Sequence, residues 1–306
     1  MLKMAREEIR YNGLSWLNIP QPTEEDTRYL GDKFKFHPLD LKDCLSVTGT
    51  PKIDVYEDYL FIVFHFPEYN HDTNRILYHE LDIFIGKNYL ITMYRGEFES
   101  AAGFVNYLKN DQEAGEQYMS KGPGFLLYNL IGPLFKKSYS VVDKIGENIT
   151  RIEDEIYSDK TMDVVKELAI ERRHVLNFRR IIEPQRFILD SLVHLRRDFL
   201  GKESEIYFDD IHDHIERIWL FLENYREIVE GLHDTNEAMM SHKINEIMKM
   251  LTLISVCLLP LTLIASIYGM NIELPLADHP NAIWVIMGVM FLVIVSVVAY
   301  VNKKAA

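Results

Sequence analysis

The amino-acid sequence predicts an α+β domain that continues through a long helical stalk into a two-helix transmembrane hairpin. The hairpin is predicted by two segments that contain no charged residue, Met250–Ile272 and Ala282–Val301. Each is about 20 residues long, and at a rise of about 1.5 Å per residue each can cross a hydrocarbon layer of about 30 Å as a helix. The first 118 residues instead contain runs of aromatic and β-branched side chains, which are typical of strands.

The net charge of −13 is distributed unevenly over the 306 residues. Residues 241–306 hold four lysines and three acidic residues, so residues 1–240 carry a net charge of −14. Because domains that bind nucleic acid present a basic surface, nucleic acid is excluded as a partner. Lys243, Lys249, Lys303 and Lys304 flank the outer ends of the two uncharged segments. The positive-inside rule therefore predicts a multi-pass protein of the cell membrane with both termini in the cytoplasm.

The part before the hairpin is expected to contain strands first and helices afterwards. Strands of a mainly antiparallel sheet are expected at Tyr59–Tyr69, Ile76–Ile85 and Tyr89–Tyr94, short helices at Thr23–Leu30 and Pro38–Leu45, and longer helices over Leu126–Ile156 and Val164–Ile182. Gly201 is the expected end of the last of these helices.

A stalk helix is expected to lead into the membrane, because apolar residues recur at alternating spacings of four and three from Ile211 to Met239. With Pro260 as the first proline in the pattern, one helix from about Glu203 to Tyr268 is predicted. The expected divisions are a cytoplasmic α/β domain (1–118), a cytoplasmic helical pair (119–202), the stalk helix (203–246), the first transmembrane helix and pore (247–271), an external loop (272–281) and the second transmembrane helix (282–302).

One face of the first span is not evenly apolar. Steps of three or four residues from Asn245 reach Met248, Thr252, Ser255, Leu259, Thr262, Ser266 and Gly269. A second series, taken as the opposite face, is wholly apolar: Met240, Ile244, Ile247, Leu251, Ile254, Leu258 and Leu261. The small polar residues indicate either a water-filled conduit or close packing of helices within the membrane, and the series alone is compatible with both.

The end of this series favours a conduit for a hydrated cation. Gly269 is expected to release the helix, which leaves the amide carbonyl of Asn271 at its mouth. Since Mg²⁺ gives up its water reluctantly, neutral oxygens that accept hydrogen bonds from that water suit it. Two spans cannot enclose a pore, so identical chains must surround a common axis as a homo-oligomer within the lipid bilayer.

The segment Leu259–Asn271, which reads Leu-Pro-Leu-Thr-Leu-Ile-Ala-Ser-Ile-Tyr-Gly-Met-Asn, resembles the CorA-type magnesium/cobalt transporters of the two-span GxN superfamily. The resemblance extends to His37-Pro38-Leu39, to Pro51-Lys52, and to Tyr207-Phe208-Asp209-Asp210 with Asp213-His214. It therefore covers essentially the whole chain.

This resemblance implies a funnel-shaped homopentamer that passes Mg²⁺, and often Co²⁺ or Ni²⁺, into the cell. It makes Gly269, Met270 and Asn271 the selectivity mouth, Thr262 a pore-lining residue, and Met248, Leu251 and Leu259 hydrophobic constrictions. It also implies that the pore closes when intracellular Mg²⁺ binds acidic sites between subunits, with Asp210 as one such carboxylate. Divalent ions are then both substrate and regulatory ligand, and no resident cofactor is expected.

The sequence departs from the family pattern in two places. After Asn271 the acid Glu273 is kept, but Leu274–Ala277 replaces the usual Met-Pro-Glu-Leu and Asp278 is the next acid of the external loop. Asn70 stands where an acidic partner for the regulatory site is expected. Glu68 and Asp72 are the nearby carboxylates that can take its place.

The densest group of potential metal ligands lies at the start of the stalk and consists of Asp209, Asp210, His212, Asp213 and His214. Asp210, Asp213 and His214 are expected to share a helical face as cation ligands, with a solvated first helical turn as the alternative. Cys44 and Cys257 lie far apart and indicate neither a disulfide framework nor a cysteine zinc site.

No enzyme is expected, because neither a Gly-rich phosphate loop nor a His-Glu-x-x-His zinc motif occurs in the sequence. Two alternatives to a magnesium transporter remain. One is a zinc-transporting relative with the same fold, although Met270 favours the magnesium branch. The other is a membrane-tethered oligomeric scaffold that conducts nothing.

Overall fold

The computed structural model describes residues 6–47, 50–70, 72–158, 164–270 and 281–305. The chain divides into two compact units, Met1–His233 and Asp234–Ala306. The first unit holds the mixed α/β part and the beginning of the long helix α8 (Ser204–Tyr268). The second holds the rest of α8 and helix α9 (Ala282–Ala305).

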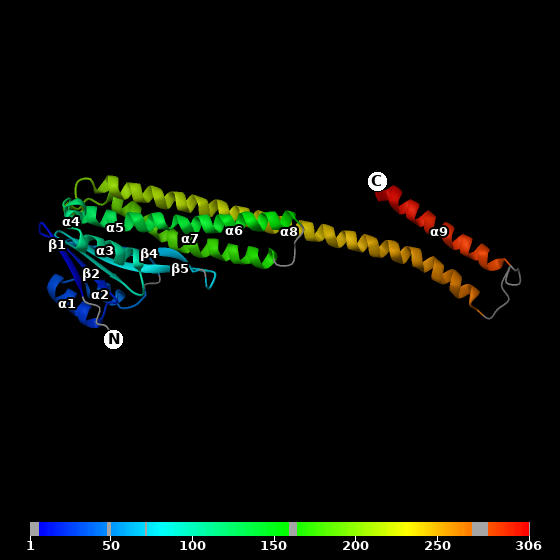
Figure 1. The fold of residues 1–306 in the computed structure, drawn as a ribbon, viewed down its shortest axis with the longest axis horizontal. Helices are drawn as coiled ribbons and strands as arrows, with labels where there is room; N and C mark the ends of the chain where they lie inside the picture. Colours follow the sequence, from blue (N-terminus) through cyan, green and yellow to red (C-terminus); the bar gives the residue numbers. More distant parts are fainter. Residues whose placement is uncertain (1–5, 48–49, 71, 159–163, 271–280, 306) are drawn as a thin grey trace. The chain divides into compact units, whose positions relative to one another are not determined.

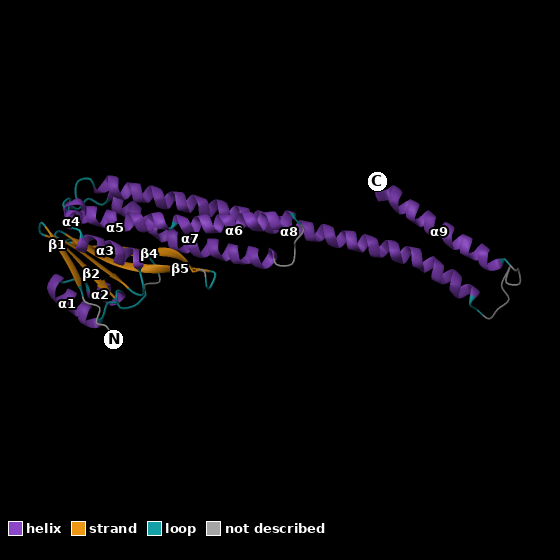
Figure 2. Ribbon diagram, viewed as in Figure 1, coloured by secondary structure: helices purple, strands orange, loops and turns teal. Residues whose placement is uncertain are grey.

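The first unit is built around one six-stranded sheet (Figures 1 and 2). Its strands lie in the order β1-β2-β6-β5-β4-β3. They are β1 (Glu7–Tyr11), β2 (Leu14–Pro20), β3 (Lys52–Val55), β4 (Tyr59–Asn70), β5 (Arg75–Gly86) and β6 (Tyr89–Tyr94). β2 and β6 are parallel, and all other neighbours in the sheet are antiparallel.

Helices cover both faces of the sheet, which explains why β4 is apolar without alternation. Phe61 and Val63 point toward α1 (Glu24–Phe34) and α2 (Pro38–Asp43), in a core that includes Leu30 and Cys44. Leu60, Ile62 and Phe64 point into the larger core on the other face. That core is shared with α3 (Glu99–Asn110), α4 (Gln112–Met119), α5 (Pro123–Lys137), α6 (Tyr139–Tyr157), α7 (Val164–His194), the short 3₁₀ helix Asp198–Leu200, and α8.

Two close contacts place α7 and α5. The side-chain amide of Gln185 on α7 is fully buried; it accepts a hydrogen bond from the backbone N–H of His65 and donates one to the carbonyl of His65, at 3.0 and 2.9 Å. At the start of α5, a Cβ on Gly124 would lie 2.0 Å from the carbonyl oxygen of Leu200. Only glycine allows this close approach of the two backbones.

The stalk part of α8 packs through the apolar seam seen in the sequence. Ile211, Ile215, Ile218 and Leu222 are fully buried, and Val229 and Leu232 of the same seam are buried as well. On α7, Arg179 and Arg186 each lie 4.7 Å from the centre of the Trp219 ring of α8. The same two arginines form ion pairs with Glu223 and Glu216 of α8, so charge as well as apolar packing joins the helices.

The predicted α+β domain with a long helix is confirmed, and details differ. The three predicted strands are present within one residue at each end, whereas β1, β2, β3, α3 and α4 were not predicted. The helix expected over Leu126–Ile156 is two helices, because α5 ends at Lys137 and α6 begins at Tyr139. Gly201, with φ +91°, ends the 3₁₀ helix rather than α7.

Asp82 is a buried carboxyl group in the middle of this sheet. It pairs with Val63 and Met93 on the two flanking strands, is 3% exposed, and its Oδ1 has no hydrogen-bond partner among the described residues. Burial, reinforced by the nearby charge of Glu80, raises the pKa of Asp82 to about 8. The folded protein therefore keeps a proton here that the unfolded chain releases near pH 4.

Since the folded state binds this proton more tightly, stability should fall as the pH rises from about 4 to about 8. Asp82→Asn cannot ionise, so it should stabilise the protein near pH 8 by more than about 1 kcal/mol relative to its effect near pH 5. Thermal unfolding of the full chain in detergent, followed by tryptophan fluorescence, measures the difference. A gain that is equal at both pH values would contradict the assignment.

Candidate functional site

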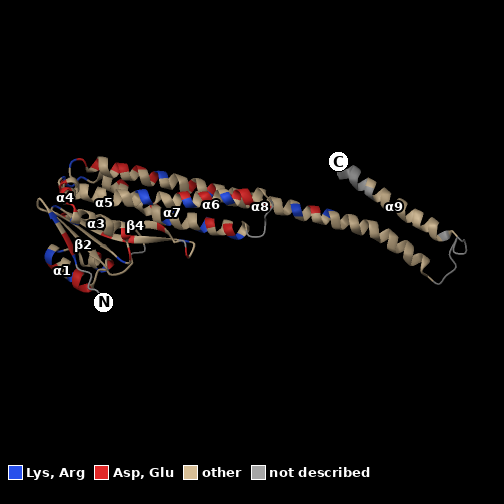
Figure 3. Cartoon of the chain, in the orientation of Figure 1, with Lys and Arg blue, Asp and Glu red and all other residues tan. Residues whose placement is uncertain are grey.

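The candidate conduit lies on the second half of α8. Between Glu237 and Met270 no described side chain is buried in the single chain, although the segment after Lys249 is apolar. Among the described residues, α8 is the one helix both long and apolar enough to cross a membrane, and Ile283–Val297 of α9 is a shorter apolar stretch. Lys249 is the last charged residue of α8, and Figure 3 shows no charged residue along the final part of this helix.

Three hydroxyl groups of this segment share one geometry. Each donates its hydrogen to the backbone carbonyl four residues earlier: Thr252 to Met248 at 2.7 Å, Ser255 to Leu251 at 2.9 Å and Thr262 to Leu258 at 2.9 Å. A hydroxyl group has one hydrogen, so each of these oxygens can only accept a further hydrogen bond. Exposed Ser266 continues the same series.

The prediction that the two series lie on opposite faces of this helix is wrong. At about 100° per residue, the series from Asn245 to Gly269 and the apolar series from Met240 to Leu261 are centred about 90° apart, and they are not opposite faces. Met248 and Leu259 lie within the hydroxyl series, whereas Leu251 lies at its border. The residues directly opposite the hydroxyl series include Ile264.

The helix ends differently from the expected glycine release. The N–H of Gly269 still bonds to the carbonyl of Ala265, and the N–H of Met270 bonds to that of Ile267. Gly269 has no positive φ, so the last turn tightens and no left-handed residue ends it. Met270 is exposed. Asn271, Glu273 and Asp278 lie outside the described residues.

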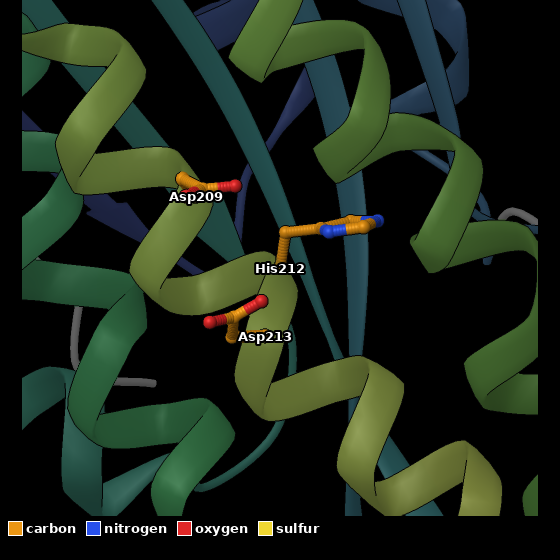
Figure 4. Close-up of side chains that lie close together, drawn as sticks. All are labelled: Asp209, His212 and Asp213. Carbon is orange, nitrogen blue, oxygen red and sulfur yellow. The ribbon is translucent and has the colours of Figure 1, made fainter.

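The acidic group at the start of α8 is arranged differently from the predicted face. Asp209, His212 and Asp213 bring one ligand atom each within 4.8 Å of one another, on successive turns of the helix (Figure 4). Asp210 instead accepts a hydrogen bond from Tyr128 of α5 at 3.1 Å. His214 contacts Arg217 through Nδ1, and burial together with the Arg217 charge lowers the pKa of His214. Within one chain, Asp210 and His214 are thus engaged with other side chains, and Asp213 lies closest to Asp209 and His212.

Sequence reasoning placed His212 in this group of potential ligands but not on the predicted helical face. Asp209 precedes His212 by three residues and Asp213 by four, which is the spacing by which Asp210 precedes Asp213 and His214. The His212 imidazole also lies 3.6 Å from Glu216, which holds Arg186 of α7. The contacts of the neighbouring helices, which the sequence does not show, separate the two possible sets.

The other predicted regulatory carboxylates lie at the end of the β4–β5 hairpin. Glu68 is exposed, bonds to His79 at 2.5 Å and lies 3.9 Å from Lys137. Asp72 is exposed in the turn. Asn70 accepts hydrogen bonds from the N–H and the hydroxyl of Thr73, both at 2.8 Å, so it shapes the turn in place of an acid.

Comparison with known proteins agrees with this architecture. Residues 11–304 match the family model described as CorA-like Mg²⁺ transporter protein. The cobalt/magnesium transport protein CorA of Thermotoga maritima is 31% identical over 300 residues, which cover 95% of this chain and 82% of that protein. The complete structure of the CorA magnesium transporter from Methanocaldococcus jannaschii matches with a TM-score of 0.80 at 23% identity, over 97% of this chain and 93% of that one.

The full-length structure of CmaX is similar in fold, with a TM-score of 0.74 at 20% identity over 99% of this chain and 91% of that one. Because the family model spans almost the whole sequence and the Thermotoga protein is similar over nearly its full length, the chain belongs to the family of CorA-like Mg²⁺ transporters, whose members are transporters and not enzymes.

Proposed function

We propose that this chain conducts divalent cations, chiefly Mg²⁺ with Co²⁺ and Ni²⁺ as further candidates, through a homo-oligomeric pore lined by α8. The observation that carries the proposal is the set of hydroxyl groups whose hydrogens are already given to the backbone. Water bound to a cation directs its hydrogens outward, so it needs acceptors around it. Oxygens that can only accept suit a hydrated cation and would repel an anion.

The spacing of the series supports several copies of α8 around one axis. Its members alternate in steps of three and four residues from Asn245 to Gly269, which is the heptad pattern of helices that supercoil together. In one chain these side chains are exposed. Neighbouring copies would enclose them around water, and five copies are proposed from the family resemblance alone.

In this proposal Gly269, Met270 and Asn271 form the selectivity mouth, with the Asn271 carboxamide meeting the hydrated ion. Met248, Leu251 and Leu259 form hydrophobic constrictions, and Asn245, Thr252, Ser255, Thr262 and Ser266 line the rest of the path. Glu273 and Asp278 attract cations from the external loop. α8 and α9 both span the bilayer with cytoplasmic termini, so an inside-negative potential drives entry at about 2.3 kcal/mol per charge per 100 mV.

We further propose that internal Mg²⁺ closes the pore by binding carboxylates of adjacent subunits. Asp209, His212 and Asp213 form one ligand group on α8. Asp210 follows Asp209 in the helix and accepts a hydrogen bond from Tyr128. Glu68 and Asp72 are the candidate partners from the hairpin. The ion is substrate and regulator, with no resident cofactor.

A substitution at the selectivity mouth tests whether the protein is a transporter or a non-conducting scaffold. Asn271→Ala removes the carboxamide that meets the hydrated ion, so divalent uptake into vesicles that contain the purified protein should be lost while the oligomer persists on size exclusion. Unchanged uptake would favour the scaffold. The same vesicles loaded in parallel with Mg²⁺, Co²⁺, Ni²⁺ and Zn²⁺ indicators separate a magnesium from a zinc transporter.

The acceptor role of the hydroxyl series is tested at Thr262. Thr262→Val keeps the shape but loses the oxygen, and because one hydrogen bond contributes about 1 kcal/mol net, Mg²⁺ flux should fall several-fold. Thr262→Ser should conduct nearly normally. Ile264→Val, on the opposite side of the helix, is the matched control and should leave flux intact. Normal conduction by Thr262→Val would show that the hydroxyl serves packing instead.

Neutralising Asp209, Asp210 and Asp213 together should keep the pore conducting when internal Mg²⁺ is millimolar. Asp209→Asn with Asp213→Asn, compared with Asp210→Asn alone, shows which carboxylates sense the ion. Patch-clamp currents at stepped internal Mg²⁺ provide the measurement. The sensing assignment is wrong if the triple variant is still suppressed at the same Mg²⁺ concentration as the unaltered protein.

A further inference from the structure

A histidine–glutamate pair buried in the first unit holds the tip of the β4–β5 hairpin. His174 and Glu171 lie one helical turn apart on α7, and they are 1% and 4% exposed. His174 Nε2 lies 2.9 Å from the backbone carbonyl oxygen of Asn74, at the start of β5. His174 Nδ1 lies 3.2 Å from Glu171 Oε2, and Glu171 Oε1 accepts a hydrogen bond from Asn148 of α6 at 2.9 Å.

These contacts fix the number of protons on the pair. A backbone carbonyl can only accept, so Nε2 must carry a hydrogen to bond with Asn74. The contact between Nδ1 and the Glu171 carboxyl group then needs one more hydrogen, carried either by the imidazole or by the carboxyl group. The pair therefore holds one proton beyond a neutral imidazole and an ionised carboxylate. Without it, the lone pair of Nδ1 would face a carboxylate oxygen inside the protein.

The contact with His174 holds Asn74, the last residue of the turn between β4 and β5. This residue has a positive φ of 50°, and its side chain accepts a hydrogen bond from Tyr69, whose ring packs edge-on against the His174 ring. The same hairpin end carries Asn70 and Thr73, which are bonded to each other. Release of the Asn74 carbonyl would therefore loosen the segment that lies between Glu68 and β5.

Protons from solvent can reach the pair. A cavity of about 350 Å³ lies beside it and is lined by Tyr69, Asn74, Asn148 and Glu171. The other charged groups around the pair come from two helices. Arg173 of α7 lowers the pKa of His174, and Arg151 of α6 is occupied by Glu155 and Glu167. Lys166 of α7 also lines the cavity.

We propose that Glu171 and His174 form a proton-dependent latch that holds the β4–β5 hairpin tip at low and neutral pH and releases it when the cytoplasm becomes alkaline. Burial lowers the pKa of His174, but its hydrogen bonds to Glu171 and Asn74 outweigh burial, and the pKa is raised overall. A raised histidine pKa means that the latch is complete below the ordinary value near 6.5 and is lost as the pH rises through the higher folded value.

Two variants separate the proton from the packing. Glu171→Gln can donate to Nδ1 of a neutral His174 and still accept from Asn148, so its latch should be independent of pH. His174→Phe combined with Glu171→Gln keeps the ring but removes both hydrogen bonds without leaving an unpaired buried charge, so its hairpin tip should be loose at every pH.

Hydrogen exchange of the full-length protein in lipid nanodiscs measures the latch directly. For peptides that cover Thr73–Tyr78, protection of the unaltered protein, corrected for intrinsic exchange, should fall on the order of threefold or more between about pH 6.5 and about pH 8.5. Glu171→Gln should stay protected and the double variant should stay exposed. Protection that is independent of pH in the unaltered protein, or equal in all three proteins, would overturn the proposal.

The consequence for gating rests on the proposed function, because Glu68 and Asp72 lie on the same end of the hairpin as Asn74. If those carboxylates sense Mg²⁺, the internal Mg²⁺ concentration that halves the current should rise with pH in the unaltered protein and stay constant in Glu171→Gln. A pH-dependent latch without this shift would leave the latch intact and refute its link to regulation. Absence of any current would instead contradict the proposed transport function.

Discussion

The second half of α8 is governed by one constraint, which is that polar atoms in a hydrocarbon layer need hydrogen-bond partners. The backbone satisfies itself within the helix, and the hydroxyl groups of Thr252, Ser255 and Thr262 give their hydrogens to the same backbone. Their remaining lone pairs can still accept hydrogen bonds, which water or another chain would donate. The family membership, the heptad spacing and the exposure of this face in one chain all agree with copies of α8 around a hydrated path.

In the first unit, polar side chains join the start of α8 to neighbouring elements. His212 lies between two carboxylates of the candidate metal group and Glu216, and Glu216 binds Arg186 of α7. α7 in turn holds β4 through Gln185 and the hairpin tip through His174. Helix α7 therefore contacts both the start of α8 and the hairpin that carries Glu68 and Asp72.

Much of this could be read from the sequence where a periodic pattern is long. β4, β5 and β6 are buried runs of aromatic and β-branched residues, and the stalk seam continues over many turns, so both were predicted correctly. β1 and β3 are short edge strands with little apolar contrast, and β2 lies parallel to β6 only because distant segments meet in the fold. The break at Ser138 leaves helical spacing unchanged on both sides, so periodicity could not reveal it.

The site was predictable to the same degree. The hydroxyl series and the Tyr-Gly-Met-Asn motif follow from spacing and resemblance. Spacing allows two sets of metal ligands at the start of α8, and the contacts of Asp210 with Tyr128 and of His214 with Arg217 could not be read from the sequence. The proton on the Glu171–His174 pair was invisible because its partners, Asn74 and Asn148, are distant in sequence.

The most direct test of the account asks whether water reaches the hydroxyl side of α8. In a Cys257→Ser background, with Cys44 buried, single cysteines replace Ser255 or Ile264 in the full-length protein in bilayers. A charged thiol reagent attacks only a hydrated thiolate, so the account predicts rapid modification at position 255 that Mg²⁺ slows, and none at position 264. Equal reactivity at both positions, or modification confined to position 264, would contradict it.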